Sequence, residues 1–223
     1  HSTSDSNSSS MLGRIYQYAM RWLISWVPTH YVACGSAAAD YLFHEQYNVE
    51  IIPNAIDVNH FSNSCGKRLK TALNFQDECI VILQVGRLIS VKNQAWSLKV
   101  AKAMQEASIK FQMLFVGSGP DLDALTSQAH VLGLDGQVRF LGLREDVAEL
   151  MAAADVMLMP SLHEGFPVVL VESQAAGLPA VISSAISTEV DLRLGLIHFH
   201  ELNQSAESWG KAIVSAAHKP QAD

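Results

Sequence analysis

Charged residues and cysteines are both scarce in this sequence. Charged residues make up 17% of the 223 residues, and acidic side chains outnumber basic ones, which gives a formal net charge of -7. Nucleic-acid-binding proteins usually present a basic face, so the acidic balance argues against that role. The three cysteines, Cys34, Cys65 and Cys79, are odd in number and lack metal-ligand spacing. This is typical of a reduced, cytoplasmic protein.

A long apolar run is also missing. The most apolar early stretch, residues 16–34, is interrupted by Arg21, Pro28 and His30. A membrane-spanning helix needs about 20 consecutive apolar residues, so this stretch is not predicted to span. It predicts a helix over 11–27 instead. That helix either packs within the protein or makes a peripheral contact with the inner face of a membrane.

Short apolar runs dominate the second part of the chain. Hydrophobic residues make up 49% of the sequence, which is enough for a packed core. Most of the runs do not alternate with polar residues, as expected of strands buried on both faces. Their alternation with helical patterns predicts an α/β fold with a doubly wound parallel sheet. The predicted strands are 80–85, 111–116, 138–141, 156–159 and 180–182, and the predicted helices are 92–107, 121–132, 145–153 and 168–176.

The first part of the chain is organised differently. Short strands are predicted at 31–34 and 49–52, with a helix over 37–44 between them. The stretch from 57 to 76 has few apolar residues and is the best linker candidate. The candidate linker region, residues 51–77, separates residues 1–50 from residues 78–223.

The first candidate site follows the predicted strand 80–85. Gly86 stands at the strand end, where the lack of a side chain lets the backbone approach a ligand closely. Arg87 and Lys92 bracket a loop that leads into a helix, and two cations near a helix start suit a diphosphate. The alternative is a pair of solvated surface cations, since the motif has no Walker-type glycine spacing.

The second candidate site follows the predicted strand 156–159. Glu164 lies in the loop after the strand, and Glu172 lies about a turn and a half inside an apolar helix. A carboxylate in that position needs a partner, because burial of an unpaired charge is costly, and the hydroxyls of a ribose are candidates. The alternative makes Glu172 a structural carboxylate and Glu164 a surface residue. It explains either residue alone better than it explains the pair.

The residues between these two glutamates predict a helix start. Pro167 suits the first turn of a helix. The free backbone N–H groups of Gly165, Phe166 and Val168 would point out of that start, where anions bind.

Two further patterns are weaker. Residues 117–120, Gly-Ser-Gly-Pro, are similar to a phosphate loop but lack the G-x-G-x-x-G spacing. They predict a tight turn, with Asp121 capping the next helix. His198 and His200 have strand spacing without a third type of metal ligand, so no metal site is predicted there.

Taken together, these motifs resemble the retaining glycosyltransferases of the GT-B fold, family four in the usual numbering, over roughly residues 30–215. Within that family, the sequence is most similar in its motifs to bacterial exopolysaccharide or capsule transferases. The matching motifs are the E-x7-E pair Glu164 and Glu172, Gly-Arg-Leu…Lys at 86–92, Gly-x-Gly-Pro at 117–120, Phe-Leu-Gly at 140–142 and Gly-Leu-Pro at 177–179.

The resemblance implies a Rossmann-like carboxyl-terminal lobe of a GT-B enzyme and a role for each site residue. Arg87 and Lys92 would neutralise the donor diphosphate as it leaves, and Glu164 would bind hydroxyls of the donor sugar. Glu172 would hold the ribose, and the loop 142–144 would lie near the base. The implied donor-binding residues are Gly86, Gly165, Phe166, Pro167, Glu172 and Leu143.

The resemblance also implies a hexosyltransferase-type activity. Such an enzyme transfers a sugar with retention from a nucleotide-diphosphate sugar, UDP-linked at the family level, to a saccharide or lipid-linked acceptor. It acts in polysaccharide or glycoconjugate biosynthesis and needs no cofactor or divalent metal, because cationic side chains and a helix start take the metal's role. Two alternatives stay open: a non-catalytic nucleotide-binding lobe, and a GT-B nucleotide-sugar epimerase, against which the E-x7-E pair argues.

Two departures from the family pattern matter. The turn between lobes has Ala55 where the family usually has glycine. Because alanine tolerates a positive φ poorly, the turn must differ or carry strain. The resemblance implies that residues 78–223 are the nucleotide-sugar donor-binding lobe and that residues 1–50 are only the tail end of the amino-terminal acceptor lobe, without its Gly-rich loop. The helix expected after Ala217 is also missing. We therefore expect a piece of a longer enzyme, which on its own is expected to bind rather than to react.

Overall fold

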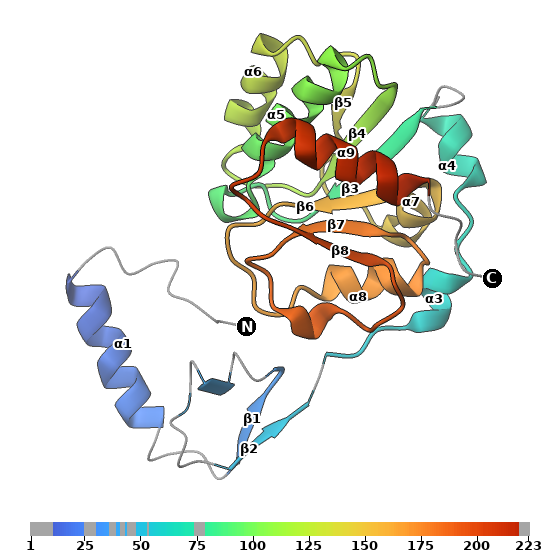
Figure 1. Ribbon diagram of the computed structural model, residues 1–223. Coiled ribbons are helices and arrows are strands. Elements are labelled where there is room, and N and C mark those ends of the chain that lie inside the picture. The colour runs from blue at the N-terminus through green and yellow to red at the C-terminus, as the bar shows by residue number, and fades with distance from the viewer. Residues whose placement is uncertain are drawn as a thin grey trace. The chain divides into compact units, whose positions relative to one another are not determined.

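The computed structural model describes residues 11–24, 30–35, 39, 40, 43, 48–52, 54–73 and 79–218 (Figure 1). Contacts divide the chain into two compact units. The first unit contains residues 1–55 and Glu164–Phe166, and the second contains Ile56–His163 and Pro167–Asp223. The helix predicted over 37–44 lies mostly outside the described residues.

The described residues of the first unit include helix α1 and a small parallel sheet. Helix α1, Met11–Ile24, confirms the predicted helix as far as the described residues reach. Strands β1, Tyr31–Ala33, and β2, Val49–Ile51, pair in parallel, with Tyr31 opposite Val49. Among the described residues, no helix is both long and apolar enough to cross a bilayer.

The turn that contains Ala55 differs from the glycine-containing turn of the resemblance. Among the described residues other than glycine, only Asn93, Ser108 and Arg193 have a positive φ. Ala55 is not one of them, so its backbone carries no left-handed strain. Of the two outcomes expected from the sequence, the turn differs rather than being strained.

The second unit is built around a parallel sheet of six strands. The strand order across the sheet is β5-β4-β3-β6-β7-β8, and every neighbouring pair is parallel. The predicted strands are confirmed, and the prediction omits β8. The strands are β3 Ile80–Val85, β4 Phe111–Val116, β5 Val138–Phe140, β6 Val156–Met159, β7 Ala180–Ser183 and β8 Ile197–His200.

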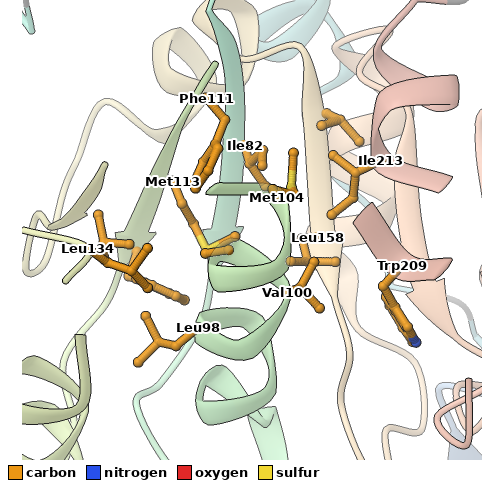
Figure 2. Close-up of a cluster of buried hydrophobic side chains, with 14 of the residues drawn as sticks. Ile82, Leu98, Val100, Met104, Phe111, Met113, Leu134, Leu158, Trp209 and Ile213 are labelled. Atoms are coloured by element: carbon orange, nitrogen blue, oxygen red, sulfur yellow. The ribbon is translucent and has the colours of Figure 1, made fainter. Parts of the chain in front are cut away.

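Both faces of this sheet are covered. Ile82, Met113 and Leu158 point to one face, where they pack with Met104 and Trp209 from two helices (Figure 2). The residues next to these in the strands point to the other face and are buried as well. The continuous apolar runs in the sequence follow from this double burial. The helices are α5 Gln94–Glu106, α6 Leu122–Val131, α7 Val147–Ala153, α8 Val168–Ala175 and α9 Ala206–Ala217, with short 3-10 turns at Ser90–Lys92 and Thr188–Val190.

The order of the strands places a switch point in the middle of the sheet. From β3 the chain moves outward through β4 to β5, then returns to the other side of β3 as β6 and continues to β7 and β8. Ile82 of β3 lies opposite Val156 of β6. In open parallel sheets, ligands bind in the crevice at the carboxyl ends of the two strands where the order reverses. We therefore look for the site at the ends of β3 and β6.

The stretch predicted to be a linker contains two short helices. Helix α3, Val58–Ser62, packs on α7 and α8, and helix α4, Lys67–Ala72, packs on α7. At Gly66, the residue before α4, an added Cβ would lie 2.4 Å from the backbone of Ala153. The low apolar content reflects shallow packing, since only Leu69 is buried in these helices. The three-part division of the chain stays a prediction.

Candidate functional site

Two pockets open at the carboxyl end of β3. The first, here called the Glu172 pocket, has a volume of about 410 Å³ and is lined in part by Lys92, Pro167 and Glu172. The second, here called the Leu143 pocket, has a volume of about 590 Å³. Val85, Gly86 and Val147 line both pockets, so the two adjoin at the predicted switch point.

The loop after β3 carries one cation into each pocket. Arg87 is exposed and lines the Leu143 pocket, whereas Lys92 lines the Glu172 pocket. Gly86 has a φ of 153°, and a Cβ added there would lie 3.5 Å from Cε of Lys92. That distance is an ordinary contact, so the positive φ rather than a lack of space favours glycine here, and the open approach for a ligand stays a prediction.

The end of this loop is fixed to the loop after β6. Asn93 adopts the left-handed conformation, with a φ of 55°, and its side-chain amide donates to the Pro160 carbonyl at 2.9 Å. The Leu162 backbone N–H donates to the Val91 carbonyl at 2.9 Å. These bonds bridge the two strand ends at the switch point. Sequence analysis missed this role of Asn93, although asparagine is the residue that most often adopts this conformation after glycine.

The loop after β4 also packs on the loop after β3. A Cβ added at Gly117 would lie 2.1 Å from the Gly86 carbonyl oxygen, and one added at Gly119 would lie 2.1 Å from that of Leu88. The Leu88 N–H donates to the Ser118 carbonyl at 3.0 Å. The backbone of the predicted tight turn therefore packs directly against the backbone of the loop after β3. Asp121 occupies the predicted N-cap position of α6, but its side chain makes no capping hydrogen bond, so only the position was predicted correctly.

This contact gives a stability prediction. Gly119→Ala should lower the free energy of unfolding by about 2–3 kcal/mol, because the new methyl group overlaps rigid backbone. Gly136→Ala is the matched control, since nothing lies within 4 Å of an added Cβ there. Chemical denaturation of both variants checks this. Equal stability of the two would mean that the loops can separate at no cost.

The far wall of the Leu143 pocket is the loop that leads into α7. Leu143 is 79% exposed and lines the pocket beside Arg144. The Arg144 guanidinium donates to both carboxylate oxygens of Asp146, at 2.8 and 2.6 Å. This pairing lowers the pKa of Asp146 and raises the pKa of Arg144. It holds the loop against the start of α7 and leaves an apolar side chain facing the pocket.

Glu172 lies on the wall of its pocket, on helix α8. Its side chain is half-buried, and this burial raises the pKa of the carboxyl above its ordinary value, while His60 on α3 partly offsets the rise. His60 and Phe61 line the same pocket. Both come from the stretch that the sequence predicted to be a linker, so composition alone gave no sign of them.

The raised pKa makes a stability prediction with a definite sign. A carboxyl whose pKa is higher in the folded state stabilises the fold most below its unfolded pKa, and this stability is lost as the pH rises through the folded pKa. Glu172→Gln removes the titration. The variant should therefore gain stability relative to wild type as the pH rises from 4 towards neutrality.

Urea denaturation across that pH range measures the difference. Glu145→Gln is the control, because Glu145 lines the same pocket with an exposed side chain. A Glu172→Gln difference that is constant with pH would contradict the assignment.

The start of helix α8 also lines the Glu172 pocket. Pro167 is buried and is the N-cap residue of α8, one position before the predicted one. Val168 and Val169 follow it along the pocket. The first backbone N–H groups of a helix have no partner within the helix and attract anions. The helix start and Lys92 therefore line the same pocket, and both favour a bound anion.

The other predicted residues of this segment belong to the first unit. Glu164, Gly165 and Phe166 group with residues 1–55. Their predicted contacts with a donor sugar stay a prediction. The structure thus brings together Gly86, Lys92, Pro167 and Glu172 in one pocket, and Gly86, Arg87 and Leu143 in the adjoining one.

His200 of β8 has structural partners. Nε2 of His200 lies 3.1 Å from Oγ of Ser208, and its ring packs edge-on against Trp209. Within the part of the chain that the structure describes, no group of three or more His, Cys, Asp or Glu residues is placed to hold a metal ion.

Comparisons with known proteins agree on one family. The family model "Glycosyl transferases group 1" matches residues 67–220. A putative glycosyltransferase, EpsF, of Bacillus subtilis (strain 168) is 37% identical over 97% of this chain and 58% of its own length. An Escherichia coli UDP-Gal:alpha-D-GlcNAc-diphosphoundecaprenol alpha-1,3-galactosyltransferase is 29% identical over 64% of this chain and 38% of its own length. The chain thus spans about half the length of these relatives.

Solved structures show the same fold. The Anabaena HepE structure in complex with UDP-glucose superposes with a TM-score of 0.80, at 22% identity, over 92% of this chain and 58% of that one. This likeness confirms the predicted fold class, a Rossmann-like α/β lobe of the GT-B type. With the family model matching more than half of its length, this chain belongs to the glycosyl transferases group 1 family.

Proposed function

We propose that this chain carries the donor site of a retaining hexosyltransferase, which transfers a sugar from a UDP-sugar to an acceptor hydroxyl. One observation carries the proposal: two adjoining pockets at the switch point collect two cations, a helix start and a half-buried carboxylate. A nucleotide diphosphate sugar offers the complementary groups, namely phosphates, a ribose diol and a planar base.

The diphosphate is assigned to the groups around Gly86. Arg87 and Lys92 approach it from the two pockets, and the N–H groups at the start of α8 lie on the wall of the Glu172 pocket. As the bond from the sugar to the diphosphate breaks, negative charge grows on the departing phosphate. Fixed cations and helix N–H groups stabilise that charge without needing to reorganise. A bound divalent metal is not required for this role.

The ribose, which joins the base to the diphosphate, is assigned to Glu172, and the base is assigned to Leu143. Glu172 accepts hydrogen bonds from the ribose hydroxyls, which gives its half-buried carboxylate the partners that burial demands. The exposed Leu143 covers one face of the base. Glu164, with the backbone of Gly165 and Phe166, binds hydroxyls of the donor sugar.

The acceptor is proposed to be a saccharide or a lipid-linked saccharide. Support comes from relatives alone: the E. coli relative is named for UDP-Gal and a GlcNAc-diphosphoundecaprenol, and HepE was solved with UDP-glucose. A lipid-linked acceptor would place the enzyme at the inner face of a membrane, with a role in polysaccharide or glycoconjugate biosynthesis.

A donor titration and a reaction assay test the proposal. Calorimetry of this chain with UDP and with other nucleoside diphosphates asks whether the site binds and which base it prefers. Turnover of UDP-sugars by the full-length protein, followed by NMR of the anomeric proton, asks whether the sugar moves with retention. Binding without turnover would favour a non-catalytic lobe, and conversion of the UDP-sugar to its epimer without transfer to an acceptor would favour an epimerase. Failure to bind any nucleoside diphosphate would reject the donor site.

A further inference from the structure

Two buried glutamines stand directly behind the cationic loop. Gln84 is only 3% exposed and Gln94 only 2%. The side-chain amide of Gln84 donates a hydrogen bond to the backbone carbonyl of Lys92 at 3.0 Å. That of Gln94 donates to the backbone carbonyl of Arg87 at 2.9 Å. The two ends of the loop are thus held from inside the protein.

Gln84 is a polar residue in an otherwise apolar strand, and its hydrogen bond to the loop accounts for its presence there. It is the one polar residue of β3, Ile-Val-Ile-Leu-Gln-Val, in the centre of the sheet. Its Oε1 accepts a hydrogen bond from Oγ of Ser97, at 2.6 Å, and Ser97 is fully buried on α5. The amide is therefore satisfied at both ends. An apolar residue would fill this position without the cost of burying an amide, so what the amide adds is the hold on Lys92.

The cations need such a hold because their side chains are long. A lysine or arginine side chain has many rotamers, so its charged end can be placed accurately only if its backbone is fixed. Misplacing a binding group by about 1 Å can remove most of its effect. The Gln84 and Gln94 bonds fix the two backbone positions from which these side chains start.

We propose that Gln84, Gln94 and Ser97 are positioning residues that set the Arg87 and Lys92 charges for a diphosphate. The inference rests on the proposed function for the identity of the ligand. It does not rest on it for the hold on the loop, which is a property of the chain alone.

The test compares two glutamines of the same sheet. Gln84→Met keeps the length and volume of the side chain but removes both hydrogen bonds. Gln112→Met is the matched control: Gln112 is also buried, lies on β4, and bonds the Gly136 carbonyl at 2.9 Å, in a loop that lines neither pocket. Ser97→Ala removes one bond of the same network and serves if Gln84→Met fails to fold.

The first measurement is calorimetry with UDP and with uridine. Gln84→Met and Ser97→Ala should weaken UDP binding by about 5- to 30-fold, the range expected from losing a buried hydrogen bond. Uridine binding should change by less than about 2-fold, because uridine carries no phosphate. Gln112→Met should spare both ligands. An equal loss for UDP and uridine, or the same selective loss in Gln112→Met, would overturn the proposal.

The second measurement is hydrogen exchange of the free chain. Amides of residues 87–93 should exchange faster in Gln84→Met than in wild type, and at the wild-type rate in Gln112→Met. Unchanged exchange would overturn the positioning role whatever the ligand is. Wild-type chain that binds no UDP, with faster loop exchange in Gln84→Met, would reject the proposed function and leave the hold on the loop in place.

Discussion

Replacing Arg87 with alanine should weaken UDP binding by about 1.5–3 kcal/mol, the usual size of a charge-assisted hydrogen bond. Arg87 is exposed at the Leu143 pocket, and its side chain makes no hydrogen bond or ion pair with the described residues. The variant should therefore keep its stability. Uridine binding should change much less, because the lost contact is to phosphate.

Titration of both ligands with this variant gives the comparison. Lys211→Ala is the control for a general change in charge, since Lys211 is exposed on α9 and lines neither pocket. If Arg87→Ala weakens UDP and uridine equally, the guanidinium does not contact phosphate. Added salt should reduce the difference between wild type and Arg87→Ala, because screening weakens exposed charges.

Substitution of the two glutamates of the E-x7-E pair should have different effects on UDP binding and on turnover. Glu172→Gln keeps the shape of the side chain but removes the charge that strengthens its bonds to ribose, so UDP affinity should fall by roughly tenfold. Glu164→Gln should leave UDP affinity nearly intact. In the full-length enzyme it should lower kcat instead, because its contacts orient the donor sugar for reaction.

Titration with UDP and steady-state kinetics with the UDP-sugar separate these outcomes. Loss of UDP binding in Glu164→Gln with none in Glu172→Gln would mean that the two roles are reversed. Wild-type binding and turnover in both variants would make both glutamates structural.

The sheet was predictable because its strands are buried on both faces. That burial demands unbroken apolar runs such as Ile80–Leu83 and Met113–Val116. The carboxyl-end positions of Gly86 and Gly117 follow from the strand ends alone. Strand β8 was harder to find, because His198 and His200 interrupt its apolar character at the edge of the sheet.

Long-range contacts were not predictable from single segments. His60 and Phe61 reach the Glu172 pocket only because α3 packs on α7 and α8. Gln84 and Gln94 sit among apolar residues, and their partners, the carbonyls of Lys92 and Arg87, have no sequence signature. The glycines of the 117–120 turn suggest a ligand by their spacing, yet their missing side chains make room for another loop.

The switch point has a consequence for how specificity can change in evolution. The wall of the Leu143 pocket comes from segments after β4 and β5, whereas Pro167 and Glu172 come from the segment after β6. The loop after β3 and the segment from Leu143 to the start of α7 serve both pockets, since Glu145 lines the Glu172 pocket. Exchange of the segment after β4 or the segment after β6 between relatives would therefore alter one pocket and preserve the other. On the proposed assignment, contacts to the base and contacts to the ribose become separately heritable traits, joined at the shared loop after β3.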